Sequence, residues 1–338
     1  MPAKIILFYF ILSDFCAILY SVIHFRRNFL MDYVFVINPV AGKGGMADDI
    51  ARDIRDFFAN REENVNIYLS KCPGDAIRFG KEYPIPEGKE VCFVACGGDG
   101  TFYEVVNGAF GRPGASFAVY PCGSGNDFIK SIGGKKEDYL DFKKLVDGKI
   151  KICDAMKVNG HICSNLCNIG IDSIICDRIT HFKTLPGISG QMAYNLSTFT
   201  TIGAGAFGHM GFPMTITFDD GESISGRYML SVFGNGKVYG GGYYPVPDAE
   251  IDDGFIDFCS IKEVGVIKAS ELIGKYKAGK HVGNPKFDNY LEMRRCTAAH
   301  VESPVDLTVC VDGEIFKSKS VDIEIIPASL PFHIPAAE

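Results

Sequence analysis

A short apolar segment followed by a run of glycines constrains the fold of this chain more than any other feature. Residues 91–94 have the pattern of a buried strand, the run Cys96-Gly97-Gly98-Asp99-Gly100-Thr101 comes shortly after them, and residues 102–110 have a helical composition. Glycines let the backbone approach an anion closely, and the free N–H groups at a helix start point toward it. A carboxylate among the glycines suits a metal-bound phosphate better than a plain turn. We therefore favour a phosphate site over a strand–helix turn without a ligand.

The residue types at the start of that helix predict a capping box. Thr101 can cap the helix with its hydroxyl, and Glu104, three residues later, can complete the box. The helix is therefore expected to begin just after Thr101.

Four strand-like segments alternate with helical patterns between residues 33 and 132. This alternation predicts a parallel sheet, whose ligands bind at the carboxyl ends of the strands. The expected strands are residues 33–37, 66–69, 91–94 and 116–120. The polar residues that follow them are Asn38, Ser70, Asp99 and Ser124. We infer that these four strand ends converge on a nucleotide site.

From Lys151 onward the alternation gives way to repeated short β patterns. Asn159-Gly160 and Asp220-Gly221 are favoured two-residue hairpin turns, so this half predicts an antiparallel sandwich. Helices are expected at residues 190–201 and 264–279. The expected strands are residues 154–158, 161–168, 214–218, 227–233, 255–261 and 307–311.

Composition excludes some classes of protein. A net charge of −7 gives no support to nucleic-acid binding. The twelve cysteines form no paired C-x-x-C framework, and several lie in apolar strand patterns, which is typical of a reducing cytosol.

A lysine-rich segment follows in the second half of the chain, with Lys275, Lys277 and Lys280. These lysines could contact anionic head groups or lie on a solvated helix face, and we favour the solvated face.

Residues 1–30 form an apolar leader. Residues 5–25 are long enough to span a membrane, but Asp14 interrupts them, and no small-residue cleavage site marks a signal peptide. Met31 directly precedes the first expected strand. We therefore favour a mis-assigned start at this position over a membrane anchor.

The ordered series of glycine and acidic motifs resembles the bacterial soluble diacylglycerol kinase family, relatives of sphingosine and ceramide kinases. The resemblance spans about residues 32–327. It rests on the whole series, because the Gly-Gly-Asp-Gly run alone also occurs in NAD kinases and phosphofructokinases. The matching motifs are Asn38-Pro39 with Gly42, Gly74-Asp75-Ala76, Gly97 to Thr101 with Glu104 and Asn107, Gly123 to Phe128, Pro247-Asp248-Ala249 with Asp252-Asp253-Gly254, and Asp312-Gly313-Glu314.

The resemblance implies an α/β N-terminal domain with a parallel sheet, like that of NAD kinase and phosphofructokinase, and a β-sandwich second domain. Residues 31–150 would be the ATP-binding diacylglycerol kinase catalytic domain, and residues 151–319 the lipid-substrate domain. The last strand is expected to return to the first domain and complete it with residues 320–330. The β-branched run at residues 321–326 fits this return.

The resemblance also implies roles for single residues. The implied ATP-binding residues are Asn38, Pro39, Gly42, Ser70, Gly97, Gly98, Asp99, Gly100, Thr101, Glu104, Ser124, Gly125 and Asn126. Mg²⁺ would be held by the Asp253 carboxylate and the backbone carbonyls of Glu250 and Phe255, with Asp252 extending a water network. Asp312 would be the general base, supported by Glu314. From the residues alone, both acidic motifs are ordinary turns.

The implied activity is an ATP-dependent lipid kinase that phosphorylates the hydroxyl of diacylglycerol or a similar lipid, giving a product like phosphatidic acid. The resemblance implies a cytoplasmic protein, peripheral at the inner membrane face, without a nucleic-acid partner, and it allows a homodimer. The alternatives are a kinase for NAD or another small metabolite, which would use the same glycine loop, and a non-catalytic regulator that binds nucleotide or lipid.

Overall fold

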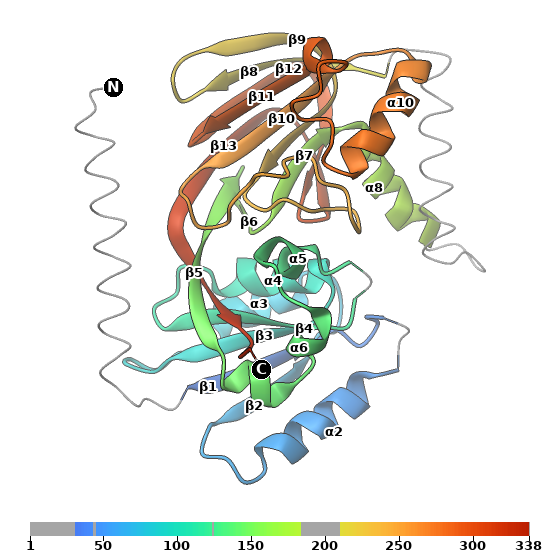
Figure 1. The fold of residues 1–338 in the computed structure, drawn as a ribbon. Coiled ribbons are helices and arrows are strands. Elements are labelled where there is room, and N and C mark those ends of the chain that lie inside the picture. The colour runs from blue at the N-terminus through green and yellow to red at the C-terminus, as the bar shows by residue number, and fades with distance from the viewer. Residues whose placement is uncertain (1–30, 43–44, 124, 184–209, 338) are drawn as a thin grey trace. The chain divides into compact units, whose positions relative to one another are not determined.

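The computed structural model describes residues 31–42, 45–123, 125–183 and 210–337 of the chain (Figure 1). The leader at residues 1–30 and the helix expected at residues 190–201 lie outside them. Two compact units are present. Unit 1 contains the described residues up to Ala155, the segment Ile251–Gly254, and the described residues from Ile326 on. Unit 2 contains Met156–Glu250 and Phe255–Ile325.

Unit 1 contains parallel strands in the order β2-β1-β3-β4. Their bounds are β1 Asp32–Ile37, β2 Val65–Leu69, β3 Val91–Gly97 and β4 Ala115–Pro121. Every residue of β3 is buried, as is usual for a strand inside a parallel sheet covered on both faces. The last strand of the chain, β13 (Glu314–Ile334), ends beside β4, where Phe332 pairs with Phe117 in parallel. The end of the chain therefore returns to unit 1, as the resemblance implies. The run at residues 321–326 that was expected to make this return is instead in unit 2 up to Ile325, where it pairs with β12 (Ala298–Val311).

The helices of unit 1 follow its strands along the chain. The amphipathic helix α2 buries Ile50, Ile54 and Phe58 in a cluster with Tyr33 and Phe35 of β1. The helix bounds are α2 Ala47–Phe58, α3 Asp75–Glu82, α4 Asp99–Ala109, α5 Asp127–Ile132, α6 Lys136–Tyr139 and α7 Phe142–Val146. The mixed α/β character of this half agrees with the prediction.

Unit 2 is dominated by antiparallel strands, with the path β11-β10-β9-β7-β12-β13 and with β8 paired to both β9 and β12. The strands are β5 Lys149–Val158, which begins in unit 1, β6 His161–Cys163, β7 Leu166–Gly170, β8 Phe212–Phe218, β9 Ser223–Gly234, β10 Ile256–Lys262, β11 Leu291–Cys296 and β12 Ala298–Val311. The helices are α8 Ile171–Lys183, α10 Val266–Lys277 and the 3₁₀ helix η1 Asp288–Tyr290.

Two expectations for this half need correction. The strand predicted at residues 161–168 is divided into β6 and β7, because Ser164 and Asn165 leave the ladder and donate backbone hydrogen bonds to Asp312. The helix α8, which follows β7 directly, was not expected from the sequence. Among the described helices, none combines the length and the apolar character needed to cross a membrane.

A buried histidine makes the stability of the chain depend on pH. The His333 ring is 4% exposed, with Nε2 3.0 Å from the Ser116 hydroxyl, and burial lowers its pKa from 6.5 to about 4. The unfolded chain binds a proton at this ring below pH 6.5, whereas the folded chain resists it until about pH 4. This histidine should therefore cost about 3 kcal/mol of stability as the pH falls through that window.

The variant His333→Asn should consequently flatten the decline in the urea unfolding midpoint between pH 6.5 and pH 4. His300 is the matched control with the opposite sign, because its hydrogen bond to Asp322 raises its pKa and stabilises the fold at acid pH. Because a raised pKa adds stability only as the pH falls toward 6.5, His300→Asn should remove a gain in stability above pH 6.5 and leave the slope between pH 6.5 and pH 4 nearly unchanged. Equal slopes for His333→Asn and the unaltered chain would contradict the prediction.

Candidate functional site

Three loops that follow β1, β3 and β4 lie against one another in unit 1. The Asn38 side-chain amide donates a hydrogen bond of 3.1 Å to the Thr101 hydroxyl, which joins the first loop to α4. Gly42 has φ +67°, and a β-carbon placed on it would lie 2.8 Å from the Cys122 carbonyl oxygen of the third loop. Ser70 lies at the same end of the sheet, since its N–H donates to the Ile37 carbonyl at 2.9 Å. The strand-end residues Asn38 and Ser70 thus lie where parallel pairing predicts.

The capping-box prediction for α4 is wrong. The helix begins at Asp99 with Gly98 as its N-cap, so Thr101 lies inside the first turn. The extended backbone of Gly98 has already ended the strand, which leaves no capping position for Thr101. Glu104 instead accepts hydrogen bonds from the N–H groups of Gly74 (2.8 Å) and Ala76 (3.1 Å). It therefore caps α3, whose own N-cap is a glycine without a side chain.

Asp99 joins the second loop to the third. Its carboxylate accepts hydrogen bonds from the backbone N–H groups of Asn126 (2.8 Å) and Asp127 (2.6 Å) at the start of α5. A negative charge at a helix N-terminus is stabilised by the unpaired N–H groups there. A β-carbon on Gly125 would lie 2.4 Å from an Asp99 carboxylate oxygen, so this loop has no space for a side chain.

The backbones of the second and third loops touch at two glycines. The N–H groups of Cys122 and Gly123 both donate to the Gly97 carbonyl, at 2.9 and 3.0 Å. A β-carbon on Gly123 would lie 2.4 Å from Gly98 Cα. Ser124, one of the predicted nucleotide residues, lies outside the described residues.

These loops fit a nucleotide phosphate. The glycine run ends at the N-terminus of α4, where backbone N–H groups lack partners within the helix. The Asn126 side-chain oxygen is buried and has no hydrogen-bond partner in the part of the chain that the structure describes. Buried polar atoms nearly always have a partner, and a nucleotide carries hydroxyl and amino donors that can serve as one. Pro39 and Gly100 belong to the same loops.

Substituting Gly123 by alanine should weaken nucleotide binding. The added methyl group would overlap Gly98 Cα, so one of the two backbones must move by more than a side-chain adjustment. We expect ATP affinity to fall by at least about tenfold, which equals about 1.4 kcal/mol, measured by isothermal titration. Gly265→Ala is the matched control, because its β-carbon would meet no atom within 4 Å. Unchanged affinity in Gly123→Ala would contradict the prediction.

The acidic motif at residues 250–255 forms a turn. Gly254 has φ +76°, and the Asp252 carboxylate lies 3.0 Å from the Lys151 ammonium group. Carboxylate and backbone carbonyl oxygens are the ligands that Mg²⁺ prefers, so Asp253 with the carbonyls of Glu250 and Phe255 has suitable donor chemistry. The described residues hold no group of three or more His, Cys, Asp or Glu side chains able to bind a metal. A magnesium ion here would thus be held by the Asp253 carboxylate together with backbone carbonyls and water.

Asp154 fixes this turn, although the sequence analysis did not select it. Its carboxylate accepts hydrogen bonds from Gly254 N and Ala328 N, both at 2.7 Å, and its own N–H donates to the Ile251 carbonyl at 2.7 Å. Burial, with a contribution from Asp253, raises its carboxyl pKa above the ordinary value. The sequence feature that could have identified Asp154 is a carboxylate inside an apolar strand pattern.

Asp312 lies in unit 2, in the two-residue hairpin between β12 and β13. Its φ is +49°, and Gly313 follows with φ +99°. One carboxylate oxygen accepts from Ser164 N (2.6 Å) and Ser164 Oγ (2.8 Å). The other accepts from Asn165 N (3.1 Å), Leu166 N (3.0 Å) and the Cys163 thiol (3.4 Å). Burial nevertheless raises the Asp312 carboxyl pKa above its ordinary value.

These contacts hold the Asp312 carboxylate in one orientation and occupy most of its acceptor capacity. Its raised pKa makes it a better proton acceptor than a solvated aspartate. Glu314, two residues on, is exposed on β13.

Asp172 is a second carboxyl of unit 2 that the sequence analysis did not select. It accepts from the Tyr239 hydroxyl (2.9 Å) and from Ser173 N (2.9 Å), and the Tyr239 hydroxyl lies 3.2 Å from that of Tyr276. Burial raises the Asp172 pKa to about 6. A sequence feature could have identified Asp172, because this residue closely follows a glycine that ends a strand, as Asp99 does.

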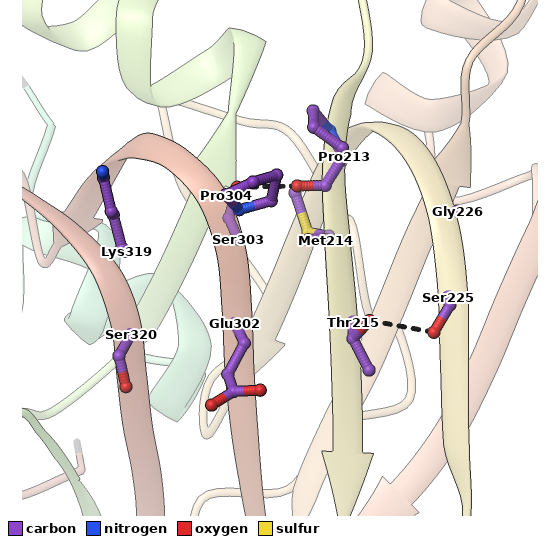
Figure 2. A pocket seen from close by; sticks show the side chains of 10 residues that line it. All are labelled: Pro213, Met214, Thr215, Ser225, Gly226, Glu302, Ser303, Pro304, Lys319 and Ser320. Atoms are coloured by element: carbon purple, nitrogen blue, oxygen red, sulfur yellow. Dashed lines mark hydrogen bonds between the residues drawn. The ribbon is translucent and has the colours of Figure 1, made fainter.

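Unit 2 also contains an open hollow of about 600 Å³ (Figure 2). It lies where the register of β12 shifts after Glu302, and a Thr215–Ser225 hydrogen bond of 2.9 Å crosses between β8 and β9. Its lining residues are Pro213, Met214, Thr215, Ser225, Gly226, Glu302, Ser303, Pro304, Lys319 and Ser320. None of the predicted site residues lines it.

Two domain families match the chain in succession. Residues 32–158 match the diacylglycerol kinase catalytic domain, and residues 165–333 match the YegS C-terminal NAD kinase beta sandwich-like domain. The chain belongs to the diacylglycerol kinase and YegS-like lipid kinase family.

Curated relatives of this chain are named as diacylglycerol kinases or as YegS-like lipid kinases. The chain is 25% identical to the diacylglycerol kinase of Bacillus subtilis, over 82% of this chain and 88% of that one. It is 28% identical to a Pseudomonas aeruginosa protein named "Probable lipid kinase YegS-like", over 72% and 76%. A solved structure of a Bacillus anthracis diacylglycerol kinase, 21% identical, superposes with a TM-score of 0.65 over 91% of this chain and 97% of that one, which shows a shared fold.

Proposed function

We propose that this chain transfers the γ-phosphoryl group of ATP to the hydroxyl of diacylglycerol or a similar lipid, giving a product like phosphatidic acid. The observation that supports this most directly is the junction of three glycine loops in unit 1, where Gly98 and Gly123 touch and Asp99 fastens the third loop. In a lipid kinase family member, a cradle of this kind suits the phosphates of a nucleotide.

In this proposal each acidic motif has one task. Mg²⁺, when bound, would neutralise charge on the phosphates, held by Asp253 and by the carbonyls of Glu250 and Phe255, with Asp252 extending a water network. Asp312 would accept the proton of the lipid hydroxyl, and Glu314 would support it. Phosphoryl transfer needs little more than position and charge neutralisation, so this set is sufficient.

The test is an assay of the full chain with γ-labelled ATP, Mg²⁺ and either extracted lipids or NAD. We expect label in a lipid product that migrates with phosphatidic acid. Label in NAD and not in lipid would overturn the proposal in favour of a small-metabolite kinase. No transfer to any lipid with ATP or GTP would favour a non-catalytic regulator. Parallel reactions with GTP measure nucleotide preference.

The proposal places the chain in the cytoplasm, in peripheral contact with the inner face of the membrane, because its substrate is a bilayer lipid. Fractionation of cells in which the natural protein is detected should find it released from membranes by high salt. Release only by detergent would contradict peripheral contact.

A further inference from the structure

The helix α10 buries one side in unit 2 and leaves isoleucines exposed on the other. Leu272 and Tyr276 are buried in the core, whereas Ile267 is 87% exposed and Ile273 is 39% exposed. At 100° per residue, Ile267 and Gly274 lie near the centre of the exposed face. Figure 1 shows α10 at the periphery of unit 2. A single exposed isoleucine is ordinary, so the surrounding charge decides what this face can bind.

The segment that contains α10 is basic in an acidic protein. Between residues 264 and 286 there are five lysines and one glutamate, while the whole chain has a net charge of −7. The glutamate, Glu271, is paired with Lys268 (3.1 Å) and with Lys286. Lys275, Lys277 and Lys280 have no acidic partner among the described residues, although Lys277 lies 5.3 Å from the centre of the Tyr243 ring. Three positive charges therefore remain available to an anionic partner.

A tyrosine extends this surface beyond the helix. Tyr244 is 36% exposed, and its Cβ would lie 3.2 Å from a β-carbon placed on Gly279, two residues after α10. Tyrosine is favoured at membrane–water boundaries, because its ring is apolar and its hydroxyl is polar. Exposed isoleucines, an adjacent tyrosine and flanking lysines are the composition of an interfacial helix face.

We propose that this face docks the chain on a bilayer that contains anionic phospholipids. The α10 surface is defined by Tyr244, Ile267, Ile273, Lys275, Lys277 and Lys280. The inference rests on the proposed function, because a kinase for a bilayer lipid must reach the bilayer. Charge complementarity selects the occupant: the lysines attract anionic head groups, and the net negative charge of the whole chain disfavours other orientations. The isoleucines enter the boundary between head groups and acyl chains.

The lysines can be tested by sedimentation of the full chain with vesicles of phosphatidylcholine and phosphatidylglycerol. Each lysine near an anionic surface contributes about fivefold to binding, so the triple variant Lys275→Gln, Lys277→Gln, Lys280→Gln should bind about a hundredfold more weakly. The matched control is the triple variant Lys81→Gln, Lys149→Gln, Lys317→Gln, which makes the same change in net charge at exposed positions elsewhere. It should bind like the unaltered chain. Equal binding by the two triple variants would overturn the proposal.

The contribution of the apolar side chains to vesicle binding is tested with a separate variant. Ile267→Ser should weaken vesicle binding by about tenfold, because it removes the most exposed apolar side chain of the surface. Raising the salt concentration should weaken binding of the unaltered chain more than that of the lysine variant. An Ile267→Ser variant that binds normally, or a salt dependence that the lysine variant retains in full, would overturn the assignment.

A second measurement separates this proposal from the proposed function. Phosphorylation of a short-chain diacylglycerol in neutral detergent micelles should be unchanged in the lysine variant. This result would show that the variant has lost binding to the bilayer and has kept its catalytic activity. If the unaltered chain phosphorylates no lipid but the lysine variant alone loses vesicle binding, the docking surface stands and the kinase proposal falls. If the kinase is active and vesicle binding is the same in all variants, the kinase proposal stands and the docking surface falls.

Discussion

Replacing Asp312 by asparagine is expected to lower kcat for lipid phosphorylation by about 10²–10⁴-fold and to leave ATP affinity unchanged. The amide cannot take a proton from the lipid hydroxyl. Its NH₂ group would also face N–H and O–H donors from residues 163–166, which now bond both carboxylate oxygens. This mismatch should lower stability by about 1–3 kcal/mol. Kinetics, isothermal titration with ATP and thermal unfolding together measure the three effects.

The matched control for this variant is Ser164→Ala. It removes one donor to the Asp312 carboxylate, the Ser164 hydroxyl at 2.8 Å, and leaves the carboxylate in place. A moderate loss of stability with most of the turnover retained is expected, because four donors still orient the group. Near-normal turnover in Asp312→Asn would remove Asp312 from the mechanism, and an equal loss in both variants would make its role structural.

The pH profile gives an independent measure of the same group. Burial raises the Asp312 pKa, so the active carboxylate is lost at a higher pH than for a solvated aspartate. The acid limb of kcat should therefore lie above the ordinary range for aspartate, with activity falling as the pH decreases through it. An acid limb at the ordinary aspartate value would argue against Asp312 as the base.

Replacing Asp99 by asparagine is expected to lower kcat/KM for ATP by about a hundredfold, equal to about one charge-assisted hydrogen bond. The carboxylate accepts from two consecutive N–H groups, Asn126 and Asp127, with one oxygen each. An amide keeps only one acceptor oxygen, so one N–H loses its partner and the third loop is released from α4.

Asp141 provides a control with the same chemistry in another place. Its carboxylate accepts from the N–H groups of Lys143 (2.8 Å) and Lys144 (3.2 Å) at the start of α7. Both bonds go to the same oxygen, Oδ1, which an asparagine would keep, so alanine is the informative substitution here. Asp141→Ala should cost about 1 kcal/mol of stability but leave kcat/KM unchanged. Equal kinetic losses in the two variants would show that Asp99 acts only as a helix cap.

The sequence predicts those parts of the fold that depend on local patterns. The apolar run at residues 91–94 lies within β3, and the helix expected at residues 264–279 corresponds to α10. The start of α4 was not predictable in this way. Its position depends on the backbone conformation of Gly98, and the partners of Glu104 lie in α3, 28 and 30 residues away.

The same distinction applies to the candidate site. The glycine run selected Asp99 because its signal is local, whereas Asp312 was selected only through the resemblance, since its motif alone predicts an ordinary turn. Asp154 was missed because its contacts, Gly254 and Ala328, are 100 and 174 residues away along the chain. β13 was expected only at residues 321–326 but covers Glu314–Ile334, because its lysines and serines conceal a strand that is partly exposed.

The return of the chain end to β4 has a consequence for synthesis. β4 is bonded to β3 on one side and to β13 on the other, and the pairing residue is Phe332. A ribosome makes β4 some two hundred residues before it makes Phe332, about ten to forty seconds earlier at ordinary elongation rates. During that interval β4 is an open sheet edge, and open edges recruit other chains. The edge of β4 therefore stays open until Phe332 has been made, and loss of Phe332 and its neighbours would leave that edge unpaired.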